Sequence, residues 1–156
     1  MRSLLTAALV LVIGTSAFGE SMGEREGWVV TKTSKSYPDL VEAVKTAITE
    51  NGFGVVTEAG PTEVARQRGV EIPGNRVIGA FNNDFAVRIL ALSVPAMIEA
   101  PVRFYVTEDS DGGATLSYKT PSLVFAPYLD EGGDELQGIV VDLDTVFLNI
   151  SSSATQ

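Results

Sequence analysis

The sequence predicts an α+β fold, in which a mainly antiparallel sheet of about five strands carries two main helices and a closing C-terminal helix packed on it. Three observations support this prediction. Segments rich in β-branched and aromatic residues alternate with segments of helical periodicity early in the chain. Two strand-like segments flank an Asp- and Gly-rich turn over 109–113, as in a β-hairpin. A long apolar stripe of helical spacing then ends the chain, and this order favours helices on one face of the sheet.

The first half of the domain alternates strand and helix. The segment 28–33 is β-branched and aromatic, which predicts a first strand. A helix is expected to begin within 36–39, because proline suits an early helical position, and to stop at the Asn-Gly pair 51–52. A second strand over 53–57 and a short helix over 62–68 follow.

The second half contains the hairpin and the closing helix. A strand over 76–81 leads into a helix over 82–94, which opens on asparagine, a good N-cap, and ends before a proline. The hairpin strands are expected over 102–107 and 114–118. Apolar residues recur at helical spacing over 136–150, which predicts the closing helix.

The N-terminus has the pattern of a secretory signal peptide. Arg2 precedes an apolar run, and small residues follow it. The run has about ten residues, whereas a membrane-spanning helix needs about 20, which argues against an uncleaved anchor. We therefore expect an exported protein, periplasmic or secreted, that does not span a membrane after cleavage. The expected organisation is a signal peptide over 1–19, a flexible N-terminus over 20–27, a single α+β domain over 28–150 and a frayed tail over 151–156.

Composition narrows the classes of function. The 20 acidic and 11 basic residues give a formal charge of −9, which repels the phosphates of nucleic acids and anionic membrane surfaces. The chain has no cysteine and no histidine, which excludes disulfides, thiol catalysis, serine-histidine-aspartate triads and histidine-ligated metals. We expect a folded globule with no cofactor, no metal and no nucleic-acid partner.

Three short blocks carry a resemblance to a known family. The segments 52–58, 77–83 and 100–106 are similar to successive blocks of the family called domain of unknown function 302, and the similarity extends roughly over 28–128. The resemblance implies a compact α+β domain that commonly self-associates, and it implies no particular reaction.

Two positions depart from the pattern of that family. Many members have Cys-Asn-Pro where this chain has Phe81-Asn82-Asn83, and Pro-Cys where it has Pro101-Val102. A thiol or metal role at those positions therefore cannot operate in this chain.

The asparagine pair is one candidate ligand site. Asn82 and Asn83 precede a predicted helix, whose free backbone N–H groups can bind an anion, and Arg88 lies one turn further on. Simple capping of the helix by asparagine is the favoured alternative.

The acidic turn between the hairpin strands suggests calcium. Asp109 and Asp111 place oxygen ligands at alternate positions, yet the position where an EF-hand needs glutamate is occupied by Tyr118. Asp-Gly turn chemistry explains the same residues, so the turn is the favoured interpretation.

The hairpin supplies a second candidate ligand site. Arg103, Tyr105, Tyr118 and Lys119 are predicted to line one face of the sheet, because alternate residues share a face and the hairpin brings its strands together. Such a face suits a small anionic or amphipathic ligand. A solvated outer face is the simpler interpretation of the same residues.

These observations favour an exported, non-enzymatic binding or interaction module. A small enzyme using carboxylate, tyrosine or lysine chemistry is one alternative, and an accessory subunit of a larger exported or membrane complex is another. A homodimer is also expected, because the hairpin strands lack the lysines and prolines that protect an exposed sheet edge. The segment 121–133 offers an alternative cover for that edge.

Overall fold

A single antiparallel sheet organises the computed structural model, which describes residues 22–156. The signal peptide predicted over 1–19 lies outside the described residues. The strand order is β1-β5-β4-β3-β2, and every neighbouring pair is antiparallel. The strands are β1 (Trp28–Thr33), β2 (Gly54–Ala59), β3 (Asn75–Phe81), β4 (Val102–Glu108) and β5 (Ala114–Lys119).

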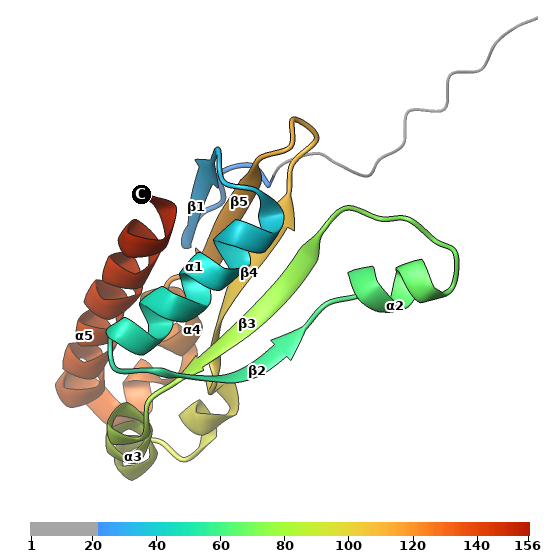
Figure 1. The fold of residues 1–156 in the computed structure, drawn as a ribbon. Coiled ribbons are helices and arrows are strands. Elements are labelled where there is room, and N and C mark those ends of the chain that lie inside the picture. The colour runs from blue at the N-terminus through green and yellow to red at the C-terminus, as the bar shows by residue number, and fades with distance from the viewer. Residues whose placement is uncertain (1–21) are drawn as a thin grey trace, which may run out of the picture.

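Helices pack on one face of this sheet, and the predicted fold class is confirmed. Figure 1 shows α1 and α5 lying across the same face, with α2 beyond the end of the sheet. In the described part of the chain no helix is long and apolar enough to cross a membrane. The helices are α1 (Tyr37–Glu50), α2 (Thr62–Gln67), α3 (Asn83–Leu92), α4 (Pro121–Phe125) and α5 (Leu129–Thr155), with short 3-10 turns η1 (Pro95–Glu99) and η2 (Ala126–Tyr128).

The strand register assigns the side chains to two faces. In the central pair, Phe104 lies opposite Tyr118 and Val106 lies opposite Leu116, and all four are buried. Their sequence neighbours point the other way, because successive side chains of a strand alternate. The sheet therefore has a core face under the helices and an open face on its other side.

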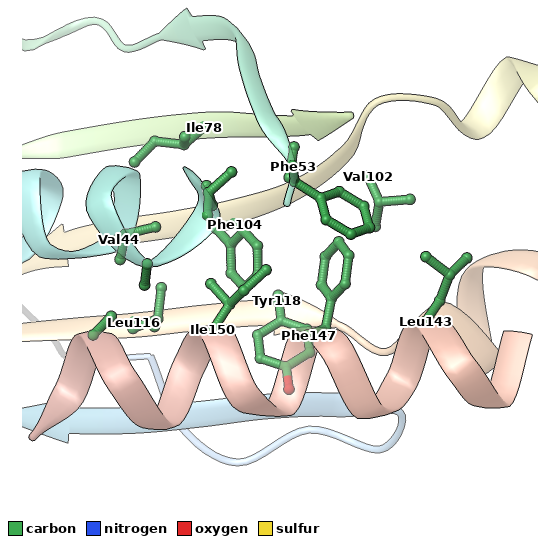
Figure 2. Close-up of a cluster of buried hydrophobic side chains, with 14 of the residues drawn as sticks. Val44, Phe53, Ile78, Val102, Phe104, Leu116, Tyr118, Leu143, Phe147 and Ile150 are labelled. Carbon is green, nitrogen blue, oxygen red and sulfur yellow. The ribbon is translucent and has the colours of Figure 1, made fainter. Parts of the chain in front are cut away.

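An aromatic cluster joins α5 to the core face. The ring of Phe147 stacks on Phe104 at 4.7 Å between centroids, and its edge meets Phe53 at 6.2 Å. Figure 2 shows Phe53, Phe104 and Phe147 converging between the sheet and the helix. Phe104 and Phe147 have no exposed surface, so this cluster is the centre of the core.

The C-terminal helix is longer than predicted. It begins at Leu129, turns at Gly133 with φ 55° and ψ −148°, and continues to Thr155. A frayed tail was expected over 151–156, and this expectation is wrong. The segment is helical to Thr155, and Ser151 and Ala154 are buried, with 3% and 1% of their surface exposed. The buried stripe of the helix simply continues past Ile150 to Ala154 at helical spacing.

The sheet edges are also different from those expected. The hairpin strands β4 and β5 lie inside the sheet, and β1 and β2 form its edges. The hairpin therefore has no exposed sheet edge, and the expectation of a dimer at that edge is wrong. Strand β1 pairs with β5 along its whole length, which the sequence did not indicate because the two strands are far apart in the chain.

Candidate binding site on the open sheet face

Two rows of side chains cross the open face of the sheet. In the first row Trp28 pairs with Lys119, and Arg103 pairs with Gly79. Lys119 and Arg103 follow and precede the paired residues Tyr118 and Phe104, so they occupy opposite positions on neighbouring strands. Side chains at such positions have Cβ atoms about 5 Å apart. The first row therefore sets an aromatic ring and two cations side by side.

The second row is mainly apolar and aromatic. Val30 pairs with Ser117, Ser117 pairs with Tyr105, and Tyr105 pairs with Val77. Val30, Tyr105 and Val77 are half-buried on this face. The apolar row lies two residues along the strands from the cationic row, which corresponds to about 7 Å.

A concavity of about 470 Å³ lies over these rows. This volume is within the range of small-molecule sites. The open face supplies Trp28, Asn75, Val77, Arg103, Tyr105 and Lys119 to its lining. Met22, Glu99 and Val124 border it from outside the sheet, so the hollow has walls as well as a floor.

The two cations of the hollow have no carboxylate partner. Arg103 and Lys119 are exposed, and neither has an acidic oxygen within 4.0 Å among residues 22–156. By contrast, Lys45 pairs with Glu58 at 3.1 Å, and Arg76 pairs with Glu63 at 2.6 Å. Like charges at opposite positions of neighbouring strands destabilise a sheet, so this arrangement favours an anion between them.

Glu99 is the acidic residue on the border of the hollow. Its Oε1 atom accepts a hydrogen bond of 2.8 Å from the hydroxyl of Tyr128. This bond and the neighbouring carboxylate raise the pKa of Tyr128. The contact holds the Glu99 carboxylate at the border of the hollow.

Aromatic groups complete the surface. The Lys119 Nζ atom lies 5.7 Å from the centre of the Trp28 ring, and the Arg25 Cζ atom lies 5.6 Å from it, both within cation–π range. The hydroxyl of Tyr105 accepts a hydrogen bond from Asn75 Nδ2. The Tyr105 hydroxyl therefore keeps its own O–H to donate to a ligand.

Tyr118 does not share the face predicted for it. It is 2% exposed, and its ring lies 5.1 Å from Phe104 and 5.7 Å from Phe147. The prediction placed both Tyr118 and Lys119 beside Arg103, but adjacent residues point to opposite faces. Burial, with a smaller contribution from Asp144, raises the pKa of Tyr118 to about 12. Tyr118 nevertheless contributes to the lining of the hollow.

The asparagine site lies apart from the hollow. Asn82 Oδ1 accepts hydrogen bonds of 2.9 and 3.2 Å from the backbone N–H groups of Asp84 and Phe85, as an N-cap does. The Asn82 amide also donates to the carbonyl of Gly52. Asn83 is exposed, and the Arg88 guanidinium lies 5.6 Å from the Phe85 ring. The structure therefore does not bring these residues together with Arg103 and Tyr105.

The acidic hairpin turn is organised by the protein itself. Asp111 Oδ2 pairs with Lys32 Nζ at 2.7 Å, and Asp111 Oδ1 accepts from the backbone N–H of Gly113. These contacts lower the pKa of Asp111, and the same pair raises the pKa of Lys32. Among the described residues, no group of three or more His, Cys, Asp or Glu side chains is placed to hold a metal ion.

Trp28, Asn75 and Val77 line the hollow although no local pattern in the sequence indicates them. Trp28 reaches the hollow because β1 pairs with β5, and Asn75 and Val77 reach it because β3 pairs with β4. Both pairings join segments that are distant in the chain. The sequence does show directly that side chains in β4 alternate between the two faces, because exposed or half-buried residues such as Arg103 and Tyr105 alternate with buried ones.

The fold and this surface define a class of protein: an α+β domain with one sheet face buried by helices and the other face hollowed. The chain belongs to the family described as domain of unknown function DUF302, which matches residues 29–147. The family resemblance seen in the sequence is therefore confirmed.

A solved structure supports the same fold. The crystal structure of an uncharacterized conserved DUF302 protein from Bacillus stearothermophilus is similar, with a TM-score of 0.73 and 16% sequence identity. The match covers 85% of this chain and 100% of that chain. At this identity the similarity shows the fold alone. Comparison with curated proteins gave no match.

Proposed function

We propose that this protein is a non-enzymatic binding module that holds a small ligand on its open sheet face. The observation that carries the proposal is the hollow of about 470 Å³ above Trp28, Val77 and Tyr105, on the face opposite the core. Half-buried aromatic and apolar side chains at the floor of a concave surface are typical of ligand sites. The open face contributes little to the packing of the core, so its residues are free to serve binding.

A neutral amphiphile tests this proposal. Trp28 is the single tryptophan of the chain and lines the hollow, so its fluorescence reports directly on occupancy. Titration with 1-octanol is expected to change the fluorescence saturably. Val77→Lys, which places a charge on the floor, is expected to weaken binding about tenfold, because an apolar contact is lost. The absence of a saturable change in the wild type would contradict the proposal.

A matched variant controls for the added charge. Val64 lies on α2 with 47% of its surface exposed and does not line the hollow. Val64→Lys is expected to leave both the midpoint and the amplitude of the titration unchanged. Equal losses in the two lysine variants would show a nonspecific effect of charge.

We further propose that the protein is exported. The support is the order of basic, apolar and small residues over 1–19. N-terminal sequencing of the cellular protein is expected to begin at Glu20 or Phe18. Recovery of the intact Met1 form from the soluble cytoplasmic fraction would contradict export.

Self-association is a separate proposal, and it concerns the edge strand β2. Strand β2 ends the sheet, carries a single charge in Glu58 and exposes 52% of Val56. Unpaired backbone groups on such an edge can pair with a second copy of the chain. Sedimentation equilibrium at micromolar concentrations is expected to give a dimer mass that falls to a monomer mass in Val56→Pro. A monomer mass at every concentration for the wild type would exclude the dimer.

An accessory subunit is a second candidate, supported by one apolar surface beside the hollow. Val94 and Ile98 are 72% and 80% exposed, and Glu99, the next residue, borders the hollow. Exposed apolar side chains that lie close together mark contact surfaces. A photocrosslinking amino acid at position 98 is expected to give one discrete adduct in cells, and the same group at position 64 is expected to give none. Indistinguishable results at both positions would contradict this role.

A further inference from the structure

We infer that the ligand of the open face is an amphipathic anion, with its acidic head between Arg103 and Lys119 and its apolar body against Trp28 and Val77. The inference rests on the proposed binding function and specifies the class of ligand. It arises from the juxtaposition of a cationic row and an apolar row within one hollow.

The cationic row places two like charges at opposite positions of neighbouring strands. Acidic residues outnumber basic ones by 20 to 11, yet Arg103 and Lys119 stand side by side with no carboxylate within 4.0 Å in the described chain. Among the described residues, Lys32, Lys45 and Arg76 have acidic partners within 4.0 Å. An anionic head group would relieve the repulsion between the two cations and provide the missing partner.

The donors of the row suit an oxyanion. The guanidinium of Arg103 presents N–H groups in a planar fork, which matches the two oxygens of a carboxylate. Lys119 adds a point charge from the neighbouring strand. Tyr105, one step along β4 on the same face, has a hydroxyl proton that remains available after the hydroxyl oxygen accepts from Asn75.

The apolar part of the site fixes the other end of the ligand. Val77 and the Tyr105 ring lie in the second row, about 7 Å along the strands from the cations. Trp28 adds an aromatic surface at the end of the cationic row. A simple inorganic anion would leave this floor uncovered, whereas an alkyl or aromatic carboxylate would cover it.

Three probes with the same eight-carbon chain separate the contribution of the head group. Octanoate, 1-octanol and octyltrimethylammonium are titrated at low salt, well below micelle formation, and the Trp28 fluorescence gives each midpoint. Octanoate is expected to bind about tenfold more tightly than 1-octanol, because its carboxylate forms ion pairs with Arg103 and Lys119 that a neutral hydroxyl cannot form. Octyltrimethylammonium is expected to bind most weakly. Added salt is expected to weaken the binding of octanoate and not of 1-octanol.

Two variants assign the preference to the proposed residues. Arg103→Gln and Lys119→Gln are each expected to weaken octanoate about fivefold or more and to weaken 1-octanol clearly less, because the apolar floor remains and the hydroxyl carries no charge. Affinity is taken from the midpoint, since Lys119 lies 5.7 Å from the Trp28 ring and its loss alters the starting fluorescence. Arg68→Gln, which removes an exposed guanidinium outside the hollow, is the matched control and is expected to change nothing.

The outcomes separate this inference from the proposal on which it rests. Equal affinity for octanoate and 1-octanol, with no effect of Arg103→Gln, would overturn the anionic preference and leave the binding function standing. The absence of a saturable response to all three probes would overturn both. Unchanged circular dichroism of each variant ensures that a loss of binding is not a loss of fold.

Discussion

The two faces of the one sheet differ in what their side chains contact. On the core face, Phe104, Leu116 and Ile78 have no exposed surface and lie under the helices. On the open face, Arg103 and Lys119 are exposed, and the hollow lies above them. The same strands supply both sets, one residue apart. The alternation of side chains along each strand therefore separates the residues that stabilise the core from the residues that line the hollow.

The separation has a physical consequence for substitutions. A change on the core face leaves a cavity or an unpaired group, because the interior is closely packed. A change at the exposed positions of the open face, such as Arg103 and Lys119, alters a solvated surface, where the cost to stability is small. Substitutions of the two kinds should therefore divide into those that affect unfolding and those that affect binding.

Phe147→Ala is expected to have the largest effect on stability. The side chain is fully buried and contacts Phe53, Phe104 and Tyr118. Its loss is expected to lower the free energy of unfolding by about 3–5 kcal/mol, the usual cost of a large-to-small change in a core. Urea denaturation measures this value. A loss below about 1 kcal/mol would mean that α5 does not anchor the core face.

Tyr118 gives the core face a dependence on pH. Its pKa is raised to about 12 from an ordinary value of 10.0, mainly by burial. Between these values the unfolded chain has lost the phenolic proton while the folded protein keeps it. Stability that is fully present below pH 10 is therefore lost as the pH rises toward 12, by about 2 kcal/mol.

Tyr118→Phe supplies the control for this effect. Other groups also titrate at high pH, so the difference between the two proteins isolates the contribution of Tyr118. The free energy of unfolding of the phenylalanine variant is expected to fall less steeply above pH 10 in urea titrations. Parallel curves for both proteins would mean that the Tyr118 hydroxyl is solvated.

Arg103→Gln is expected to have the smallest effect on stability. It removes one of two neighbouring cations without a carboxylate partner, so in the absence of ligand it should be neutral or stabilise the fold by about 0.5 kcal/mol. Thermal unfolding at low and high salt measures the change, since salt screens the repulsion in the wild type. A destabilisation above about 1 kcal/mol would make Arg103 a structural residue and weaken the contrast between the faces.

The sequence was sufficient to predict the fold class and most of the elements. Local signals determine these features: the turn at 109–113 connects β4 and β5, and apolar spacing over 136–150 marks the buried face of α5. The end of α5 was misplaced because Ser151 and Ala154 are small residues, which are buried there without a strong hydrophobic signal.

The site was predicted only in part. Arg103 and Tyr105 share a face because they lie two residues apart in one strand, a relation that is local. Only one of the adjacent residues Tyr118 and Lys119 can share the face of Arg103, and the register of the hairpin, which pairs Tyr118 with the buried Phe104, decides which. Trp28 and Val77 were missed because strand order depends on contacts between distant segments, and a single sequence does not show them.

If the open face is the ligand site, a ligand is expected to contact the open face and to leave the core face unchanged. ¹H–¹⁵N NMR of the protein titrated with octanoate tests this most directly. The largest shifts are expected at the indole N–H of Trp28 and at the backbone amides of Val77, Tyr105 and Lys119, with the amides of α1 and α5 unmoved. Shifts concentrated on α1 or α5, or none at saturating octanoate, would contradict the account.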